Sequence, residues 1–156
     1  MTPARRSAGI LLYRTSDDRT EVLLVHPGGP FWARRDRGAW SVPKGEYRDD
    51  ENPQAAARRE FEEELGVAAP DGTAIDLGQV RQRSGKIVHA WALHGDLDAA
   101  QIISNTFALE WPPRSGKFVD TPEVDRAEWF ALPDAREQIN PAQKELLDRL
   151  QAALDR

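Results

Sequence analysis

Three glutamates near the middle of the chain have the residue type and spacing of a divalent-cation site. Glu60, Glu63 and Glu64 occur within a stretch of five residues. On an α-helix, at about 100° per residue, they fall within roughly one quarter of the circumference. Hard cations such as Mg²⁺ bind carboxylate oxygens of this kind. A run of glutamates can equally be a solvated surface face, so the helix alone leaves both interpretations open.

The residues around the glutamates predict the helix that would position them. Asn52 is a favourable N-cap, Pro53 a favourable first helical residue, and Gly66 stands where a C-terminal cap is expected. We therefore expect a helix over residues 53–65. An apolar stripe beside the glutamates can anchor this helix to a core, and it consists of Ala57, Phe61 and Leu65.

The charges on this helix oppose its own stability. Glu62, Glu63 and Glu64 crowd the last turn, where the helix dipole favours cations. Glu60 and Glu64 form a like-charge pair at i,i+4, which is mildly destabilising. Local rules tend to be broken where function requires it, so these charges favour a functional role.

The spacing of the flanking residues resembles a family signature. Gly45 is followed after five residues by Glu51, and after seven more by Arg59 and Glu60. With the remainder of the helix, this resembles the signature of the Nudix hydrolase family, GX5EX7REUXEEXGU, in which U is a bulky aliphatic residue. The single departure is Phe61 at a U position, which affects packing and leaves the chemistry unchanged.

The resemblance implies a reaction and a metal site. It implies Mg²⁺- or Mn²⁺-dependent hydrolysis of a phosphoanhydride bond in a nucleoside diphosphate linked to another group. Glu63 is the expected base or water-orienting residue, Arg59 would hold the glutamates by ion pairing, and Glu51 would support the loop. The expected metal ligands are the Gly45 carbonyl, Glu60, Glu63, Glu64 and a more distant glutamate. Glu123 fits that last position best, with Glu110 as its rival.

Further residues could contact the substrate. Lys44 and Lys86 are candidate phosphate contacts, although Lys44 could also be a solvated lysine. Trp40, Trp111 or Phe118 could stack on a base, although core packing is favoured for Trp40. The basic segment 31–38 is either a solvated loop or a loop that contacts phosphate or base.

The substrate remains open at this stage. Segments 40–46 and 85–93 resemble diadenosine polyphosphate hydrolases and their relatives, but an insertion over 111–117 does not align with them. A dinucleoside polyphosphate or a nucleoside triphosphate is therefore expected. Alternatives are a sugar nucleotide or a diphosphoinositol polyphosphate, an inactive nucleotide-sensing module, and an isomerase of diphosphates.

The pattern of apolar runs predicts an α/β fold. Expected strands cover 7–14, 21–26, 39–42, 75–83, 86–95, 107–111 and 127–130, and expected helices cover 53–65, 133–138 and 141–154. Residues 118–125 are expected to form a loop. Strands interleaved with helices indicate a mixed central sheet between helices, and the resemblance implies the same α/β/α sandwich with the motif helix packed against the sheet.

Composition sets the outer limits. The 156 residues are expected to form one domain over 1–156. A net charge of −5 with scattered basic residues argues against a nucleic-acid polymer as partner and favours a small nucleotide or polyphosphate. No apolar run is long enough to span a membrane, and the apolar run after the basic segment 1–6 is interrupted at Tyr13 and Arg14 and lacks a signal-peptide layout, so a cytoplasmic location is the default. There is no cysteine, and oligomeric state is left open.

Overall fold

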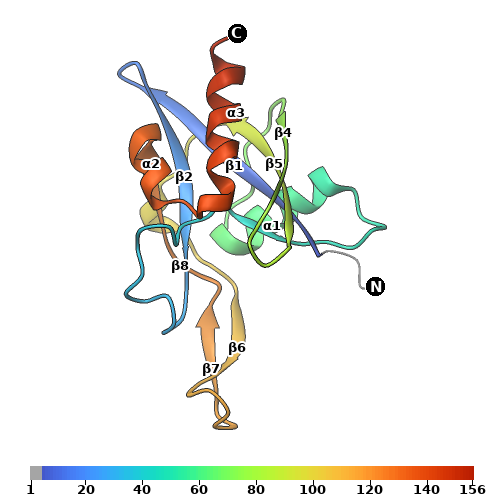
Figure 1. The fold of residues 1–156 in the computed structure, drawn as a ribbon, viewed down its shortest axis with the longest axis vertical. Coiled ribbons are helices and arrows are strands. Elements are labelled where there is room, and N and C mark those ends of the chain that lie inside the picture. Colours follow the sequence, from blue (N-terminus) through green and yellow to red (C-terminus); the bar gives the residue numbers. More distant parts are fainter. Residues whose placement is uncertain (1–4) are drawn as a thin grey trace.

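The computed structural model describes residues 5–156, in which a six-stranded mixed sheet forms the centre of the molecule (Figure 1). Its main path runs through β4 (Ile75–Arg81), β5 (Ile87–His94), β1 (Arg6–Ser16), β2 (Arg19–Pro27) and β8 (Val124–Ala131), and the short β3 (Lys44–Glu46) pairs with β1. The β1–β5 pair is parallel and the remaining pairs are antiparallel. The segment 1–4 of the expected N-terminal basic stretch lies outside the described residues.

The central strands are buried on both faces, as their continuous apolar runs predict. Ile10 and Leu12 of β1 enter one core cluster, whereas Leu11 between them enters the other. In β2, Leu23 and Leu24 divide in the same way. Because side chains alternate along a strand, each central strand contributes to the cores on both sides of the sheet.

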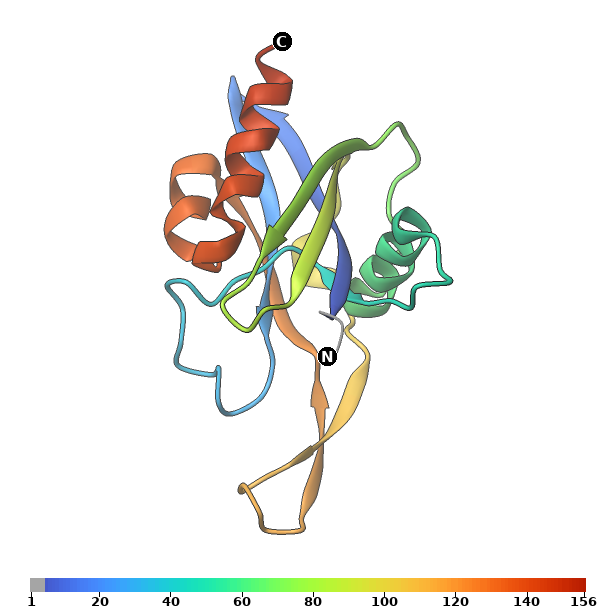
Figure 2. The ribbon, with the colours of Figure 1, turned by 45° about the vertical axis from the view of Figure 1, so that its right-hand side comes forward.

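Helices cover both faces of this sheet. One core cluster joins α1 (Pro53–Leu65) to the sheet, and the other joins α2 (Leu132–Gln138) and α3 (Lys144–Leu154) to the opposite face. Figure 2 shows α1 on one side of the sheet and α2 with α3 on the other. The predicted α/β/α sandwich, with the motif helix against a mixed sheet, is therefore confirmed.

A two-stranded hairpin extends from one end of the molecule. It consists of β6 (Thr106–Glu110) and β7 (Phe118–Pro122), and it projects beyond the main sheet in both ribbon views (Figures 1 and 2). Short 3-10 turns at Ala99–Gln101 and Pro141–Gln143 complete the fold. Within residues 5–156, no helix combines the length and apolarity that crossing a bilayer requires.

Three expectations about secondary structure were wrong. Residues 39–42 make only isolated bridges, Val25 with Ser41 and Trp40 with Ile139, and the true strand begins at Lys44 beyond Pro43, which has no N–H to donate. Residues 118–122 form β7 by pairing with β6. The two strands are separated by a long turn, so local propensity does not reveal the pairing. The expected helix over 141–154 begins as a 3-10 turn and becomes α-helical only at Lys144.

Candidate active site

The ends of α1 fix the orientation of its glutamates. The Asn52 side chain accepts a hydrogen bond from the Ala55 N–H at 3.0 Å. Gly66 adopts the left-handed conformation, with φ of 76°, and its N–H donates to the Glu62 carbonyl at 2.7 Å. Both predicted caps and the predicted bounds of the helix are confirmed. Phe61 is fully buried against the sheet, so an aromatic ring occupies the position where the signature has an aliphatic residue.

Two of the three glutamates point into the protein, against β3. Glu60 and Glu64 are 8% and 6% exposed. A Cβ atom on Gly45 would lie 1.9 Å from a carboxylate oxygen of Glu60, so the close approach of helix and strand requires glycine there. The Lys44 N–H donates to the Glu64 carboxylate at 3.3–3.4 Å. The short strand β3 therefore forms a backbone floor under both carboxylates.

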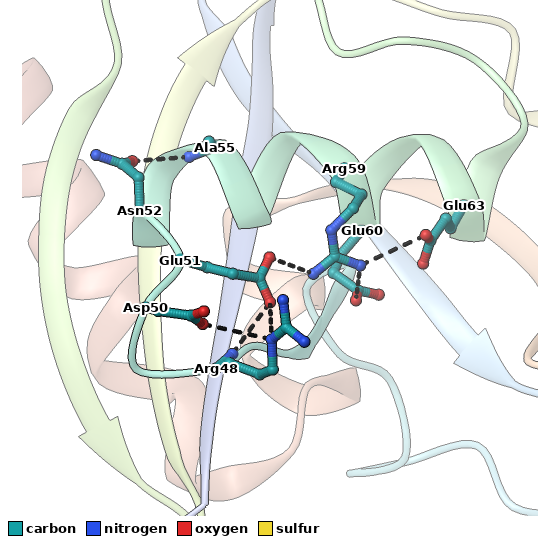
Figure 3. Close-up of polar contacts among 8 residues, drawn as sticks. All are labelled: Arg48, Asp50, Glu51, Asn52, Ala55, Arg59, Glu60 and Glu63. Atoms are coloured by element: carbon teal, nitrogen blue, oxygen red, sulfur yellow. Dashed lines mark hydrogen bonds and ion pairs between the residues drawn. The ribbon is translucent and has the colours of Figure 1, made fainter.

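Arg59 links the remaining acidic residues of the motif. Its guanidinium lies 2.8 Å from Glu60, 3.4 Å from Glu63 and 3.1 Å from Glu51 (Figure 3). The Arg48 N–H donates to Glu51 at 3.1 Å, and this bond, followed by the Arg59 guanidinium, lowers the pKa of the Glu51 carboxyl. The expected ion pairing by Arg59 and the expected loop-supporting position of Glu51 are both present in the structure.

Burial and mutual repulsion raise the proton affinity of the carboxylates. Burial raises the pKa of Glu64 to about 8, despite the nearby Lys44. Burial and then repulsion by Glu63 raise the pKa of Glu60 and also that of Glu123. Burial and then the charge of Lys86 lower the pKa of Lys44. The charge of Glu123 contributes to the raised pKa of Glu60, and the charge of Lys86 to the lowered pKa of Lys44. Both residues are distant from the motif in sequence but close to it in space.

A cavity of about 270 Å³ opens beside these groups. Lys44, Glu64 and Glu123 line one part of it, and an apolar part includes Trp32. The residues that line it are Val25, Pro27, Trp32, Ala39, Ser41, Val42, Lys44, Glu64, Gln82, Glu123, Val124 and Asn140. The Glu123 backbone is fixed between two neighbours, because its N–H donates to Asn105 and its carbonyl accepts from Gly28, each at 3.0 Å.

Glu110 lies elsewhere. Its carboxylate accepts hydrogen bonds from the N–H groups of Arg114 at 3.1 Å and Gly116 at 3.3 Å, so it caps the turn of the β6–β7 hairpin. It is absent from the cavity lining, whereas its rival Glu123 is part of it. The geometry therefore separates the two candidates for the distal position.

The aromatic residues considered for stacking on a base differ in their exposure. Trp40 is 1% exposed, its Nε1 donates to Asp36 at 2.6 Å, and its ring packs edge-on against Phe130. The core packing that the sequence favoured for Trp40 is confirmed, and its alternative assignment as a substrate-binding residue is wrong, because a buried ring cannot stack on a base. Trp111 and Phe118 are 38% and 64% exposed on the hairpin, away from the cavity lining. Sequence reasoning missed Trp32, which gave no signal beyond its place in the basic segment 31–38.

The side chains fit a hard cation in chemistry but are not arranged as a finished cage. Over residues 5–156, no three His, Asp or Glu side chains converge closely enough to hold a metal ion as they stand. In Figure 3, the Arg59 guanidinium engages both Glu60 and Glu63. Buried carboxylates with raised pKa values are nevertheless oxygen donors that a divalent cation would stabilise. The chemistry of the donor set therefore fits a hard divalent cation such as Mg²⁺ or Mn²⁺.

Comparison with known proteins decides the family. A family model described as the NUDIX domain matches residues 3–150. The chain belongs to the Nudix hydrolase family. This agrees with the signature that was recognised in the sequence, and with the placement of the motif helix against the sheet.

The individual proteins that this chain resembles carry different names. The chain is 31% identical to an octanoyltransferase of Myxococcus xanthus over 138 residues, 88% of this chain and 34% of that protein. It is 39% identical over 59 residues to an RNA pyrophosphohydrolase of Hahella chejuensis, 36% of each protein. The chain thus spans about a third of the length of these curated relatives.

Two solved structures share the Nudix fold along nearly the whole chain. A binary complex of a C. elegans Ap4A hydrolase has a TM-score of 0.67 at 22% identity, covering 97% of this chain and 98% of that one. The NUDIX domain of Shewanella oneidensis NrtR, complexed with ADP ribose, has a TM-score of 0.65 at 17% identity, covering 99% and 90%. At these identities the likeness concerns the fold alone.

Proposed function

We propose that this Nudix protein hydrolyses a phosphoanhydride bond in a nucleoside diphosphate linked to another group, with Mg²⁺ or Mn²⁺ as cofactor. A dinucleoside polyphosphate or a nucleoside triphosphate is the proposed substrate. The observation that carries the proposal is the pair of buried glutamates, Glu60 and Glu64, held by α1 against the β3 backbone beside the cavity. Burying two carboxylates is unfavourable unless a cation or proton compensates them.

The proposed ligands are oxygen atoms on both sides of the site. They are the Gly45 carbonyl and the carboxylates of Glu60, Glu63, Glu64 and Glu123. When bound, the metal ions would neutralise phosphate oxygens and lower the pKa of a coordinated water towards neutrality. Burial and then repulsion from Glu63 raise the pKa of both Glu60 and Glu123, and the repulsion supports placing these carboxylates in one cluster.

Other residues of the chain would act on the water and the phosphates. The Glu63 side chain is 41% exposed and, among residues 5–156, its one ion pair is with Arg59, so it is accessible as a base for an attacking water. Arg59 and Glu51 would hold the glutamates in place without touching substrate. Lys44 borders the cavity, and the charge of Lys86 acts, after burial, to lower the pKa of Lys44, which supports both lysines as contacts of the polyphosphate.

The apolar part of the cavity favours a nucleotide as ligand. Trp32, Val25 and Val124 line the same cavity as the carboxylates and offer a surface for a planar base. Trp111 and Phe118 stay candidates for stacking on a second base, because both are exposed on the hairpin that leads directly to Glu123.

A hydrolysis screen tests the proposal. Dinucleoside polyphosphates, nucleoside triphosphates, sugar nucleotides and diphosphoinositol polyphosphates are incubated with Mg²⁺ or Mn²⁺, and the products are separated by chromatography. We expect nucleotide release from a dinucleoside polyphosphate or a nucleoside triphosphate, loss of release with a chelator, and recovery when metal is added back. Tight nucleotide binding without any product would instead identify a sensing module and overturn the proposal.

A further inference from the structure

A buried glutamine connects three separate parts of the cavity wall. Gln143 is completely buried at the start of α3. Its Oε1 accepts from the Val42 N–H at 3.0 Å, and its Nε2 donates to Ser41 at 3.0 Å and to the Gln82 Oε1 at 2.9 Å. The network thus joins α3 to the segment before Lys44 and to the end of the β4 strand region, and both Ser41 and Gln82 line the cavity.

The network fixes which end of each carboxamide is which. The Val42 N–H is a backbone donor, so the Gln143 atom that faces it must be the oxygen. The other end of Gln143 is then an NH₂ group, which can only donate, so Gln82 must present its oxygen to it. The Gln82 NH₂ group is consequently left pointing away from Gln143.

The Asn140 side chain likewise has its oxygen engaged and its NH₂ group free, without help from Gln143. Its Oδ1 accepts from the backbone N–H of Ala142 at 3.0 Å, which leaves its NH₂ group as the unoccupied end. Within residues 5–156, neither the Gln82 nor the Asn140 nitrogen forms a hydrogen bond, and neither is among the fully buried atoms that lack a partner. Both nitrogens are therefore reachable from outside the core, on residues that line one cavity.

We propose that Gln82 and Asn140 form a donor-only wall that recognises a nucleobase whose facing edge carries two hydrogen-bond acceptors. This inference rests on the proposed function, because it deepens the choice of nucleotide for the same site. Guanine and hypoxanthine present the O6 and N7 acceptors on one edge, whereas adenine presents an amino donor beside N7. An adenine in this orientation would set donor against donor and leave desolvated groups unpaired.

Gln143 acts in this scheme as a positioning residue. It does not line the cavity, but its NH₂ group holds Gln82 in the orientation that leaves the Gln82 NH₂ group free for a ligand. Its oxygen simultaneously fixes the Val42 amide, two residues before Lys44. The specificity of the wall therefore depends on a hydrogen bond behind it.

Binding measured without turnover tests the wall separately from catalysis. Calorimetric titration of the metal-free protein with GDP, IDP and ADP should give GDP and IDP similar affinities, each about tenfold tighter than ADP. Affinities within twofold for all three would overturn the inference. A clear preference for GDP and IDP in a protein that hydrolyses nothing would retain the inference and reject the proposed function.

Two substitutions should replace the outward-facing hydrogen-bond donor of Gln82 by an acceptor. Gln82→Glu keeps an oxygen for Gln143 and replaces the outward NH₂ by an oxygen, so the GDP-to-ADP affinity ratio should fall at least fivefold. Gln143→Glu removes the NH₂ that orients Gln82, so the Gln82 carboxamide should turn over and lower the same ratio. Gln79→Glu, on the exposed side of β4, adds the same charge and should leave the ratio unchanged.

Folding of the variants is checked by their thermal unfolding. If Gln143→Glu fails to fold, Gln82→Glu decides the matter alone, because Gln82 is only partly buried. A Gln82→Glu protein that folds and keeps the wild-type ratio would overturn the donor wall.

Discussion

Helices α1 and α3 pack against opposite faces of one sheet, yet they bury different chemistry. In α3 the buried residues are Leu146, Leu147 and Leu150. Its charged side chains stay at the surface, where Arg149 pairs with Glu145 at 2.8 Å. This is the ordinary pattern of an amphipathic helix, in which the apolar stripe faces the core and the ions face water.

In α1 the buried set also includes two acids. Phe61 and Leu65 anchor the helix as the leucines anchor α3, but Glu60 and Glu64 are buried beside them. Their raised pKa values show that burial disfavours the charged form. The comparison indicates that the buried residues of α3 stabilise the fold. The buried carboxylates of α1 lower the stability of the fold, which is expected where function requires them.

The largest expected effect separates chemistry from packing on α1. Glu63→Gln keeps the size of the side chain and removes the proposed base, so we expect kcat to fall by about 10²–10⁴. Glu62→Gln on the exposed side of the same helix is the matched control and should change kcat by less than about threefold. Steady-state kinetics with Mg²⁺ measures both, and equal rates for the two variants would remove Glu63 from the base role.

A packing substitution on α3 should show the opposite behaviour. Leu147→Ala removes a fully buried side chain, and we expect a loss of about 2–5 kcal/mol in the free energy of unfolding. At a temperature where the variant is still folded, kcat should stay close to wild type. Urea unfolding gives the stability, and a selective loss of kcat in the folded variant would contradict the division of roles.

The pH dependence of stability should reveal the cost of the acids in α1. The pKa of Glu64 rises from an ordinary 4.5 to about 8 in the folded protein. Between these values the unfolded state releases a proton that the folded state retains, so the contribution of Glu64 to the free energy of unfolding decreases as the pH rises from 4.5 to about 8.

Glu64→Gln should flatten that dependence. We expect the metal-free variant to gain on the order of 2 kcal/mol relative to wild type on going from pH 5 to pH 8. Glu62→Gln, at an exposed position, should leave the slope unchanged. Chemical denaturation at several pH values with a chelator present measures it, and parallel wild-type and Glu64→Gln curves would show that Glu64 is not the titrating group.

The smallest effect concerns the distal ligand. Glu123→Gln should weaken Mn²⁺ binding by about tenfold, because Glu123 borders the cavity with Glu64. Glu110→Gln should leave the affinity for Mn²⁺ unchanged, since Glu110 caps the hairpin turn. Titration of both variants with Mn²⁺ compares them, and equal affinities would reject the ranking.

The parts of the fold that were predicted from sequence rest on local signals. The bounds of α1 follow from Asn52, Pro53 and Gly66, which act within a few residues of themselves. The pairing of β4 with β5 follows from two apolar runs around a Ser84–Gly85 turn. The sequence did not predict β7, because its partner β6 lies on the other side of the insertion at 111–117. Segment 39–42 is apolar because it is buried, but it forms only isolated bridges, so its apolar character wrongly predicted a strand.

The sequence by itself determined the family, the motif helix and the acidic residues on one side of it, because cap chemistry and helical periodicity are short-range properties. Tertiary structure alone decided that Trp40 is core, that Glu123 and not Glu110 borders the cavity, and that Gln143 orients Gln82. These relations join residues many positions apart. Only the packed sheet brings such residues together, since the distance between them is set by strand order and helix docking rather than by their separation along the chain.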